Sequence, residues 1–546
     1  MKKTISTVLA ATLVLGCAAT SAGCKAKEKI VRDSVTINVR LYEAGFGFDF
    51  LYSLEDKFEA LYKEEGYEVN ILKSPSSQGD TVIRELYKGY GDSGIDLYIT
   101  GAITPNRVSE NNEYDKELCE DLREMVFNQP AIEYDGTESA KVSERVHSDI
   151  VPYLCADNGK MYGFTWANTT AGMVVNTAKL AACGITEYPR TTNELFEVFE
   201  TIKAADKGVY PVTYDLGKGE GRAATYQDCA VSTWFAQYDI DTYNEFLRME
   251  EKKDGVWTEM DEGWKVFENE NLKDVLEVSY QFMDKKYALP GSSSQVLSQA
   301  QDAIVDNKGA VFMLNGDWFL NEVKYNFNDD ELQDIDFMNV PVISALGVKL
   351  FGEATAYNLG KEACDELLSY VCKLVDENKS IDEIVALVQS EKGIEIARED
   401  VEAVATARGV CFARGIEHLA FITKGSEKKH IAALFLRMMA SDSYAETFME
   451  DANGVSPYAN SITTESDFTF VNSAKALSLN QHYRAVNSRI QGTRFKVFSS
   501  DYMFPAIDNL ALHLYDKAAS TSYTDAANKL YNDSLNKVQD LWKDYD

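Results

Sequence analysis

The first hundred residues alternate between two kinds of apolar spacing. Apolar and polar residues alternate in Val35–Tyr42 (VTINVRLY), which predicts a strand. Next, Leu54, Phe58 and Leu61 lie one helical turn apart before Gly66, which predicts a helix that ends there. The order then continues as strand, helix and strand, over residues 67–74, 81–91 and 95–100. This alternation predicts an α/β unit with a parallel sheet.

The ends of these predicted strands indicate where a ligand is expected. In open α/β sheets, ligands bind beyond the carboxyl ends of the strands. Glu43 and Phe46 follow the first predicted strand, and Thr100 and Gly101 end the third. We therefore expect Glu43, Phe46 and Thr100 at the rim of a ligand site.

A second strand–helix alternation begins near residue 190. Thr191 and Glu194 form a predicted capping box, and Leu195, Phe199 and Ile202 share one face of the helix that follows. Further strands and helices are predicted over residues 209–216, 230–238, 271–289, 310–314 and 334–343, with a turn at 315–316 and a helix from about Asp317. Because two α/β blocks follow one another in a chain of 546 residues, we expect two lobes with separate sheets.

Helical patterns dominate the rest of the chain. Residues 361–409 have few strand signals and contain a second capping box, Ser380 with Glu383. Residues 428–450 and 524–546 also carry apolar residues at helical spacing.

The net charge of the chain bears on which kinds of molecule it can bind. The net charge is −33, with 87 acidic against 54 basic residues. Nucleic-acid binding needs clustered Lys and Arg that displace counterions, so this composition argues against a nucleic-acid partner. An acidic surface favours solubility and says little about a ligand held in one local site.

The N-terminus has the pattern of a secretory signal. Lys2 and Lys3 precede an apolar stretch, residues 5–15, that is too short to span a membrane. Cys17 and Cys24 each follow a glycine, and each resembles the acylated cysteine of a bacterial lipobox. We expect a lipoprotein with cleavage before one of the two; a secreted protein without lipid is the alternative. The predicted segments are a signal peptide, 1–24, and a polar tether, 25–34.

No pattern in the chain predicts catalysis, a cofactor or a metal site. Seven further cysteines lack C-x-x-C spacing and are interpreted as buried thiols, with one incidental disulfide left open. The five histidines lack metal-ligand spacing, and G-x-S-x-G, H-E-x-x-H and P-loop motifs are absent. A secreted glycoside hydrolase is the alternative class of protein. Such enzymes use two carboxylates, but among 87 acidic residues some pair will lie close together, so a pair neither supports nor excludes this class.

Three segments together resemble the extracellular solute-binding lipoproteins of ABC importers, in the carbohydrate-binding group similar to maltose-binding protein. They are NGKMYGFTWANTTAGMVVNTAKLAACGITEYPRTTNELFE (158–197), GAVFMLNGDWFL (309–320) and GVSPYANS (454–461). The resemblance covers nearly the whole mature chain. It implies a periplasmic-binding-protein-like α/β fold, with two α/β lobes, a hinge and a ligand cleft between the lobes. Thr165, where the family usually has Pro, and the helical insert 361–409 depart from the family pattern.

The resemblance also implies a division of the chain and a set of ligand contacts. Lobe 1 would comprise 35–168 plus about 338–455, including the insert, and lobe 2 would comprise 169–337 plus about 456–546. At the crossing between lobes, Trp166 is expected to face the cleft, where a flat ring can stack on a sugar. Tyr162 and Phe164 are interpreted as core residues. The further ligand-binding candidates are Asp317, Trp318, Tyr226, Tyr502 and Phe504.

The function implied is capture of a sugar or oligosaccharide outside the cell. Delivery would be to the permease subunits of an ABC transporter, by a monomer anchored through lipid to the outer face of the cell membrane. A peptide, a polyamine or another non-sugar solute is the alternative ligand.

Overall fold

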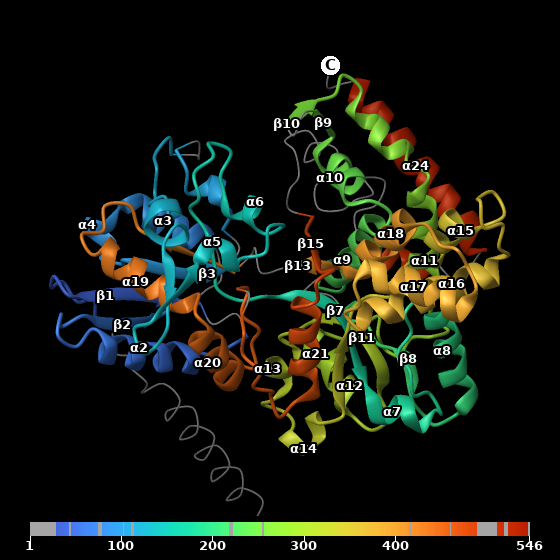
Figure 1. Ribbon diagram of the computed structural model, residues 1–546, viewed down its shortest axis with the longest axis horizontal. Helices are drawn as coiled ribbons and strands as arrows, with labels where there is room; N and C mark the ends of the chain where they lie inside the picture. Colours follow the sequence, from blue (N-terminus) through green and yellow to red (C-terminus); the bar gives the residue numbers. More distant parts are fainter. Residues whose placement is uncertain are drawn as a thin grey trace, which may run out of the picture.

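The computed structural model shows two lobes that lie side by side, joined near the middle by the strand β7 (Figure 1). Each lobe has its own mixed β-sheet, and helices cover both sheets. The described residues are 29–42, 45–74, 79–101, 103–110, 114–217, 222–253, 256–413, 418–458, 460–488, 510–517 and 522–543, with the backbone alone described for 222–228.

The sheet of lobe 1 has the order β2-β1-β3-β14-β6. β1 is parallel to β2 and β3, and β14 is antiparallel to β3 and β6. The predicted alternation of strand and helix over the first hundred residues is thus confirmed. The strands are β1 (Thr36–Leu41), β2 (Glu68–Lys73), β3 (Leu97–Gly101), β6 (Phe164–Thr165) and β14 (His418–Ile422).

Four helices contribute buried side chains to lobe 1. α2 packs against α20, and α19 contacts both although it lies far from α2 in the chain. Beside α19, Lys428 and Asp96 form an ion pair at 3.2 Å in which both side chains are almost fully buried. The helices are α2 (Asp49–Leu61), α3 (Gly79–Lys88), α19 (Lys429–Met439) and α20 (Asp442–Ala452).

The sheet of lobe 2 is built around β7, whose seven residues are all buried. Its order is β15-β13-β7-β11-β8, and β12 pairs with the C-terminal part of β7 beside β13. The strands are β7 (Thr170–Asn176), β8 (Tyr210–Val212), β11 (Ala310–Gly316), β12 (Ile335–Met338), β13 (Val410–Ala413) and β15 (Arg484–Val486).

Helices from distant parts of the chain cover lobe 2. The C-terminal helix α24 packs along α11, and α21 packs on β12. The indole of Trp234 in α9 is fully buried and its N–H donates to Pro341 O at 3.2 Å. The helices are α7 (Thr177–Ala182), α8 (Thr192–Ala205), α9 (Arg222–Ala236), α11 (Asn271–Phe282), α12 (Leu297–Val305), α21 (Thr469–Ser478) and α24 (Tyr523–Lys543).

The helical insert belongs to lobe 2, not to lobe 1 as predicted. β12 and β13, which flank the insert, both pair with β7, and this pairing carries residues 338–413 into the second sheet. Thr191, at the start of α8, also donates to Asp365 of the insert at 3.0 Å. The chain returns to lobe 1 only at β14. The insert helices are α15 (Ser344–Phe351), α16 (Lys361–Asp376), α17 (Ile381–Lys392) and α18 (Arg398–Gly409).

Both predicted capping boxes are present, Thr191 with Glu194 and Ser380 with Glu383. Two predicted boundaries were wrong. The helix predicted to end at Gly66 is α2, which ends at Leu61 and is followed by turn residues through Gly66. β11 continues through Gly316, so that the turn follows at residues 317–318. The remaining elements are α4 (Tyr90–Ser93), η1 (Pro105–Arg107), η2 (Arg123–Phe127), β4 (Pro130–Ile132), β5 (Glu138–Lys141), α5 (Val142–Arg145), α6 (Val151–Leu154), α10 (Ile240–Arg248), β9 (Glu250–Lys253), β10 (Val256–Glu259), η3 (Gly263–Glu268), α13 (Phe319–Val323), α14 (Asp329–Leu332) and α23 (Leu510–Lys517).

The cysteines in the described part of the chain are free thiols. Cys155 is half-buried and the other six are buried, as predicted for small apolar side chains. Over the same described ranges, no helix combines the length and the apolar character needed to cross a membrane.

Candidate functional site

Two of the chain segments that cross between the lobes lie side by side in the described part of the chain. A further crossing runs from β13 to β14 through residues 414–417, which lie outside it. The first leaves β6 at Trp166 and enters lobe 2 as β7. The second leaves α20 and pairs with the first, because Asn168 N–H donates to Val455 O at 2.9 Å. Two short segments held by few bonds can change their dihedral angles with less disturbance than a packed core, so this ribbon is the candidate hinge.

Trp166 lies in the core of lobe 1 and not at a cleft surface, which corrects the prediction. Its ring is fully buried and stacks on Phe50, with ring centroids 5.9 Å apart and planes 8° from parallel. The edge of Phe46 meets it at 5.8 Å, and its indole N–H donates to Thr100 O at 3.4 Å. Sequence spacing could not show that the ring turns back from the crossing into an aromatic cluster. Tyr162 and Phe164 are fully buried, as predicted.

The structure therefore brings Phe46, Thr100 and Trp166 together, but inside lobe 1. Phe46 and Thr100 are 1% and 2% exposed, and Phe46 also packs on Phe448 of α20 at 5.2 Å. In this arrangement of the lobes, these three residues support the lobe-1 side of the junction and have almost no surface to offer a ligand. Their predicted place at an open rim is corrected accordingly.

Asp317 lies at the corresponding edge of lobe 2. Its Oδ2 accepts from Thr170 N–H at 3.1 Å, and its own N–H donates to Thr170 O at 3.1 Å. Its other oxygen, Oδ1, is buried and has no hydrogen-bond partner among the described residues. Burial raises the pKa of Asp317 well above its usual range, although the two backbone N–H groups oppose that change.

Trp318 follows at the N-terminus of α13 and is 8% exposed. Its ring lies against the backbone of Gly316, where a Cβ atom would come within 2.0 Å of the ring. Only glycine leaves this space, which explains the Asn-Gly-Asp-Trp order at the end of β11. Asp317 and Trp318, which are neighbours in the chain, lie at the carboxyl end of β11 and are both buried in this arrangement of the lobes. Their contact with a ligand stays a prediction.

Two residues that sequence reasoning missed lie beside Asp317. Tyr483, which precedes β15, is buried next to Thr170, and burial raises the pKa of its hydroxyl. Thr169, on the crossing itself, has a buried hydroxyl with no partner in the described part of the chain. The adjacent threonines at the crossing, Thr169 and Thr170, were the sequence signal that could have identified Thr169. No sequence pattern indicated that Tyr483 lies near them.

The lobes touch on both sides of β7. On the β11 side, Asn321 Nδ2 of α13 donates to Ala452 O of α20 at 2.6 Å. On the other side, the His147 ring meets Tyr483 edge-on at 5.2 Å, and Asp149 Oδ2 accepts from Ala485 N–H at 3.2 Å. We call this second pair of interactions the β15-side contact.

A cavity of about 370 Å³ lies at the β15-side contact, with walls from both lobes. Its lobe-1 wall comes from residues around α5, and its lobe-2 wall from the chain between α21 and β15. Its lining includes Arg145, His147, Asn168, Tyr458, Asn480 and Tyr483.

The other predicted residues cannot be placed. Glu43, Tyr502 and Phe504, the side chain of Tyr226, and both candidate lipidation residues, Cys17 and Cys24, lie outside the described residues. Within the described ranges, no group of three or more His, Cys, Asp or Glu side chains is arranged to hold a metal ion.

Comparison with known proteins gives the fold independently. No protein-family model and no curated protein matches the sequence. Among solved structures, a chitin oligosaccharide binding protein is 12% identical, with 92% of this chain and 99% of that chain covered and a TM-score of 0.53. The bacterial solute receptor AcbH, described as preferring β-D-galactopyranose, is 10% identical, with 93% and 99% covered and a TM-score of 0.53. RafE in complex with raffinose is 13% identical, with 92% and 100% covered and a TM-score of 0.51. The chain therefore has the predicted fold of two-lobed solute-binding proteins.

Proposed function

We propose that this protein captures a sugar or oligosaccharide outside the cell and holds it, unaltered, between its two lobes. The fold and the full-length likeness to three carbohydrate-binding proteins support this proposal. The ribbon of crossing segments gives the lobes a hinge, and closure about it would remove the ligand from water.

The observation that carries the proposal is the unpartnered Oδ1 of Asp317 beside Trp318. A buried polar atom without a partner is costly, and a ligand hydroxyl that donates to it relieves that cost. Trp318 supplies an apolar ring next to the carboxylate, and sugars combine hydroxyl groups with apolar C–H faces. Opening of the lobes is needed to admit the ligand, because both side chains are nearly covered in this arrangement.

The remaining proposals concern where the protein acts and with what. The lipobox-like cysteines support a lipid anchor at Cys17 or Cys24, on the outer face of the cell membrane. Several acyl chains on one cysteine would hold the protein there, since each buried CH₂ contributes about 0.8 kcal/mol. Delivery to the permease subunits of an ABC transporter, by a monomer, follows from the same family resemblance.

One experiment distinguishes sugar binding from two alternative functions, a peptide receptor and a glycoside hydrolase. The melting temperature of the protein without its predicted signal segment is measured with chitin oligosaccharides, raffinose, galactose or a mixture of short peptides. We expect one of the sugars to raise the melting temperature, because a ligand that binds only the folded state stabilises it. Stabilisation by peptides alone would favour a peptide receptor, and release of shorter sugars during incubation would favour a glycoside hydrolase.

A matched pair of variants tests the proposed contact. Asp317→Asn keeps an amide oxygen to accept from Thr170 N–H but places an NH₂ group, which cannot accept a hydrogen bond, where the free Oδ1 lies; Asp334→Asn changes an exposed residue of the same lobe. A hydrogen bond contributes about 1 kcal/mol, so Asp317→Asn should weaken binding about fivefold or more. Equal affinity in the two variants, measured by calorimetry, would remove Asp317 from the site.

A further inference from the structure

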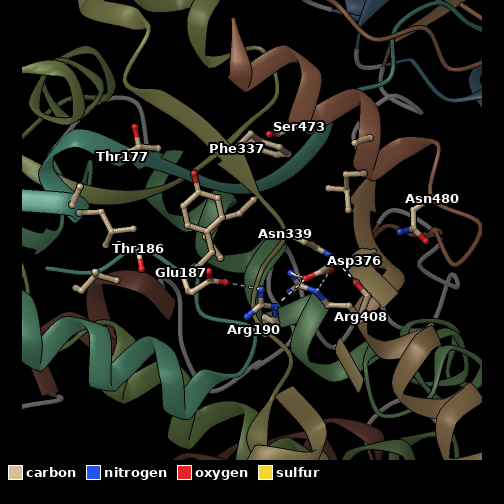
Figure 2. A pocket seen from close by; sticks show the side chains of 17 residues that line it. Thr177, Thr186, Glu187, Arg190, Phe337, Asn339, Asp376, Arg408, Ser473 and Asn480 are labelled. Atoms are coloured by element: carbon tan, nitrogen blue, oxygen red, sulfur yellow. Dashed lines mark hydrogen bonds and ion pairs between the residues drawn. The ribbon is translucent and has the colours of Figure 1, made fainter. Parts of the chain in front are cut away.

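Lobe 2 contains a second cavity, of about 610 Å³, that none of the predicted ligand residues lines. It lies between α7, the loop of residues 185–190, β12, α21 and the ends of α16 and α18 (Figure 2). Its volume is in the range of cavities that hold small molecules. All of its lining residues belong to lobe 2, so its shape does not depend on how the lobes are placed relative to each other.

Most of the cavity wall is apolar. Leu180, Ile185, Phe337 and Leu477 come from four different elements and surround one space. The ring of Tyr188 is also part of the wall, and its hydroxyl donates to Asp336 at 2.5 Å. Hydrophobic residues from several elements that leave a space unfilled provide a surface for the apolar body of a ligand.

The opposite end of the cavity carries two guanidinium groups. Figure 2 shows Arg190, Asp376 and Arg408 gathered at this end, away from Thr177. Asp376 accepts from Arg408 Nε at 2.7 Å and from Arg408 Nη2 at 3.0 Å. The same carboxylate lies 3.5 Å from Arg190 Nε, which is within ion-pair distance. Arg190 Nε has no hydrogen-bond partner among the described residues.

The two carboxylates at this end are held differently. Asp376 pairs with both Arg190 and Arg408. Glu187 pairs with Arg190 alone, at 3.1 Å, and its side chain is 75% exposed, so water screens the pair. Glu187 is therefore the carboxylate that an entering anion can displace from Arg190.

We propose that this cavity is a second ligand site, which takes a small amphipathic carboxylate. The apolar body of the ligand packs on Leu180, Phe337 and Leu477, and its carboxylate binds Arg190 and displaces Glu187. Arginine suits this role because its planar group can donate two parallel hydrogen bonds to a carboxylate. Arg408 is held by Asp376 with its side chain 8% exposed, so it supplies fixed charge and Arg190 makes the contact.

The test compares two probes of similar shape, 3-phenylpropionate and 3-phenylpropan-1-ol, by calorimetry on the full protein. We expect saturable binding of the acid and binding about tenfold weaker, or none, for the alcohol, because only the acid forms the charged pair. Arg190→Gln should weaken binding of the acid about tenfold, whereas Arg398→Gln, at an exposed arginine of α18, should not change it.

A third variant tests the place of binding without touching the ion pairs. Ala476 lines the cavity from an exposed position on α21, so Ala476→Trp can fill the space without disturbing the core. Loss of binding in this variant, with an unchanged melting temperature, supports the site. The proposal is overturned if the wild-type protein does not bind the acid at millimolar concentration, if the alcohol binds equally well, or if Ala476→Trp binds the acid like the wild type.

Discussion

Asp317 and Thr170 are joined by a reciprocal pair of hydrogen bonds, each 3.1 Å long, at the point where the chain enters lobe 2. The carboxylate accepts from Thr170 N–H, and Thr170 O accepts from the N–H of Asp317. The pair fixes the first residue of β7 to the end of β11 and leaves one carboxylate oxygen without a partner. The lobe-2 end of the crossing and the proposed ligand acceptor are therefore one structural unit.

This unit should make stability depend on pH. Burial raises the pKa of Asp317, so the folded state retains a proton that the unfolded state releases. The contribution of Asp317 to wild-type stability should therefore fall as pH rises from about 4, the ordinary pKa of Asp, toward the folded-state pKa. Asp317→Asn does not ionise, so its stability relative to wild type should improve over that range. The improvement should be about 1.4 kcal/mol for each unit by which the pKa is raised.

Urea unfolding at pH 4 and pH 7 measures this difference. Asp334→Asn, at an exposed residue, serves as the control and should follow the wild-type pH dependence. Parallel curves for wild type and Asp317→Asn would show that Asp317 is ionised equally in both states.

The β15-side contact should help to hold the arrangement in which Asp317 and Trp318 are covered. In this arrangement the lobes already touch on both sides of β7, through the bond from Asn321 to Ala452 O and the bond from Ala485 N–H to Asp149. A ligand held between the lobes in this arrangement is stabilised by both bonds, so Asp149→Ala should lower the affinity for sugar. One hydrogen bond contributes about 1 kcal/mol, which corresponds to about fivefold.

Calorimetry with the sugar selected by the melting screen tests this expectation. Asp157→Ala is a matched control, because Asp157 bonds to Asn106 within lobe 1 and not across the lobes. A higher affinity for Asp149→Ala would show that the contact opposes the ligand-bound arrangement.

The ion pair of Lys428 with Asp96 should be essential to lobe 1. Asp96 also accepts from Asn38 N–H at 2.9 Å and from the Ser426 hydroxyl at 2.6 Å, so its charge is compensated by three partners. Asp96→Asn leaves the lysine charge buried without a counter-ion, and such losses cost about 3–5 kcal/mol. Denaturant unfolding should show this loss, while Asp540→Asn, in an exposed pair with Lys543, should change stability by less than about 0.5 kcal/mol. A loss for Asp96→Asn as small as that of the control would contradict the account.

Membrane attachment should depend on one cysteine near the N-terminus. In bacterial cells, replacement of the acylated residue, Cys17 or Cys24, by Ala should release the protein from the membrane fraction. Replacement of the other cysteine should leave it attached. Mass spectrometry of the N-terminal peptide identifies the residue, and release by neither variant would contradict a lipid anchor at these positions.

The local elements could be predicted because their signals are local. Strand alternation and the two capping boxes depend on residues a few positions apart, and both were confirmed. The lobe that contains the insert could not be predicted, because periodicity does not say which sheet a strand joins. β13 pairs with β7, although most of the lobe-2 sequence lies between the two strands in the chain. The burial of Trp166 depends on Phe50, from another element, and the β15-side contact joins Asp149 to Ala485, 336 residues apart.

The central claim is that two rigid halves close on a sugar, and small-angle X-ray scattering tests it most directly. The radius of gyration is measured with and without the sugar that gives the largest rise in melting temperature. The account predicts that saturating sugar lowers the radius of gyration, and that a sugar with no effect on melting leaves it unchanged. Identical scattering curves in the presence of a sugar that calorimetry shows to be bound would contradict it.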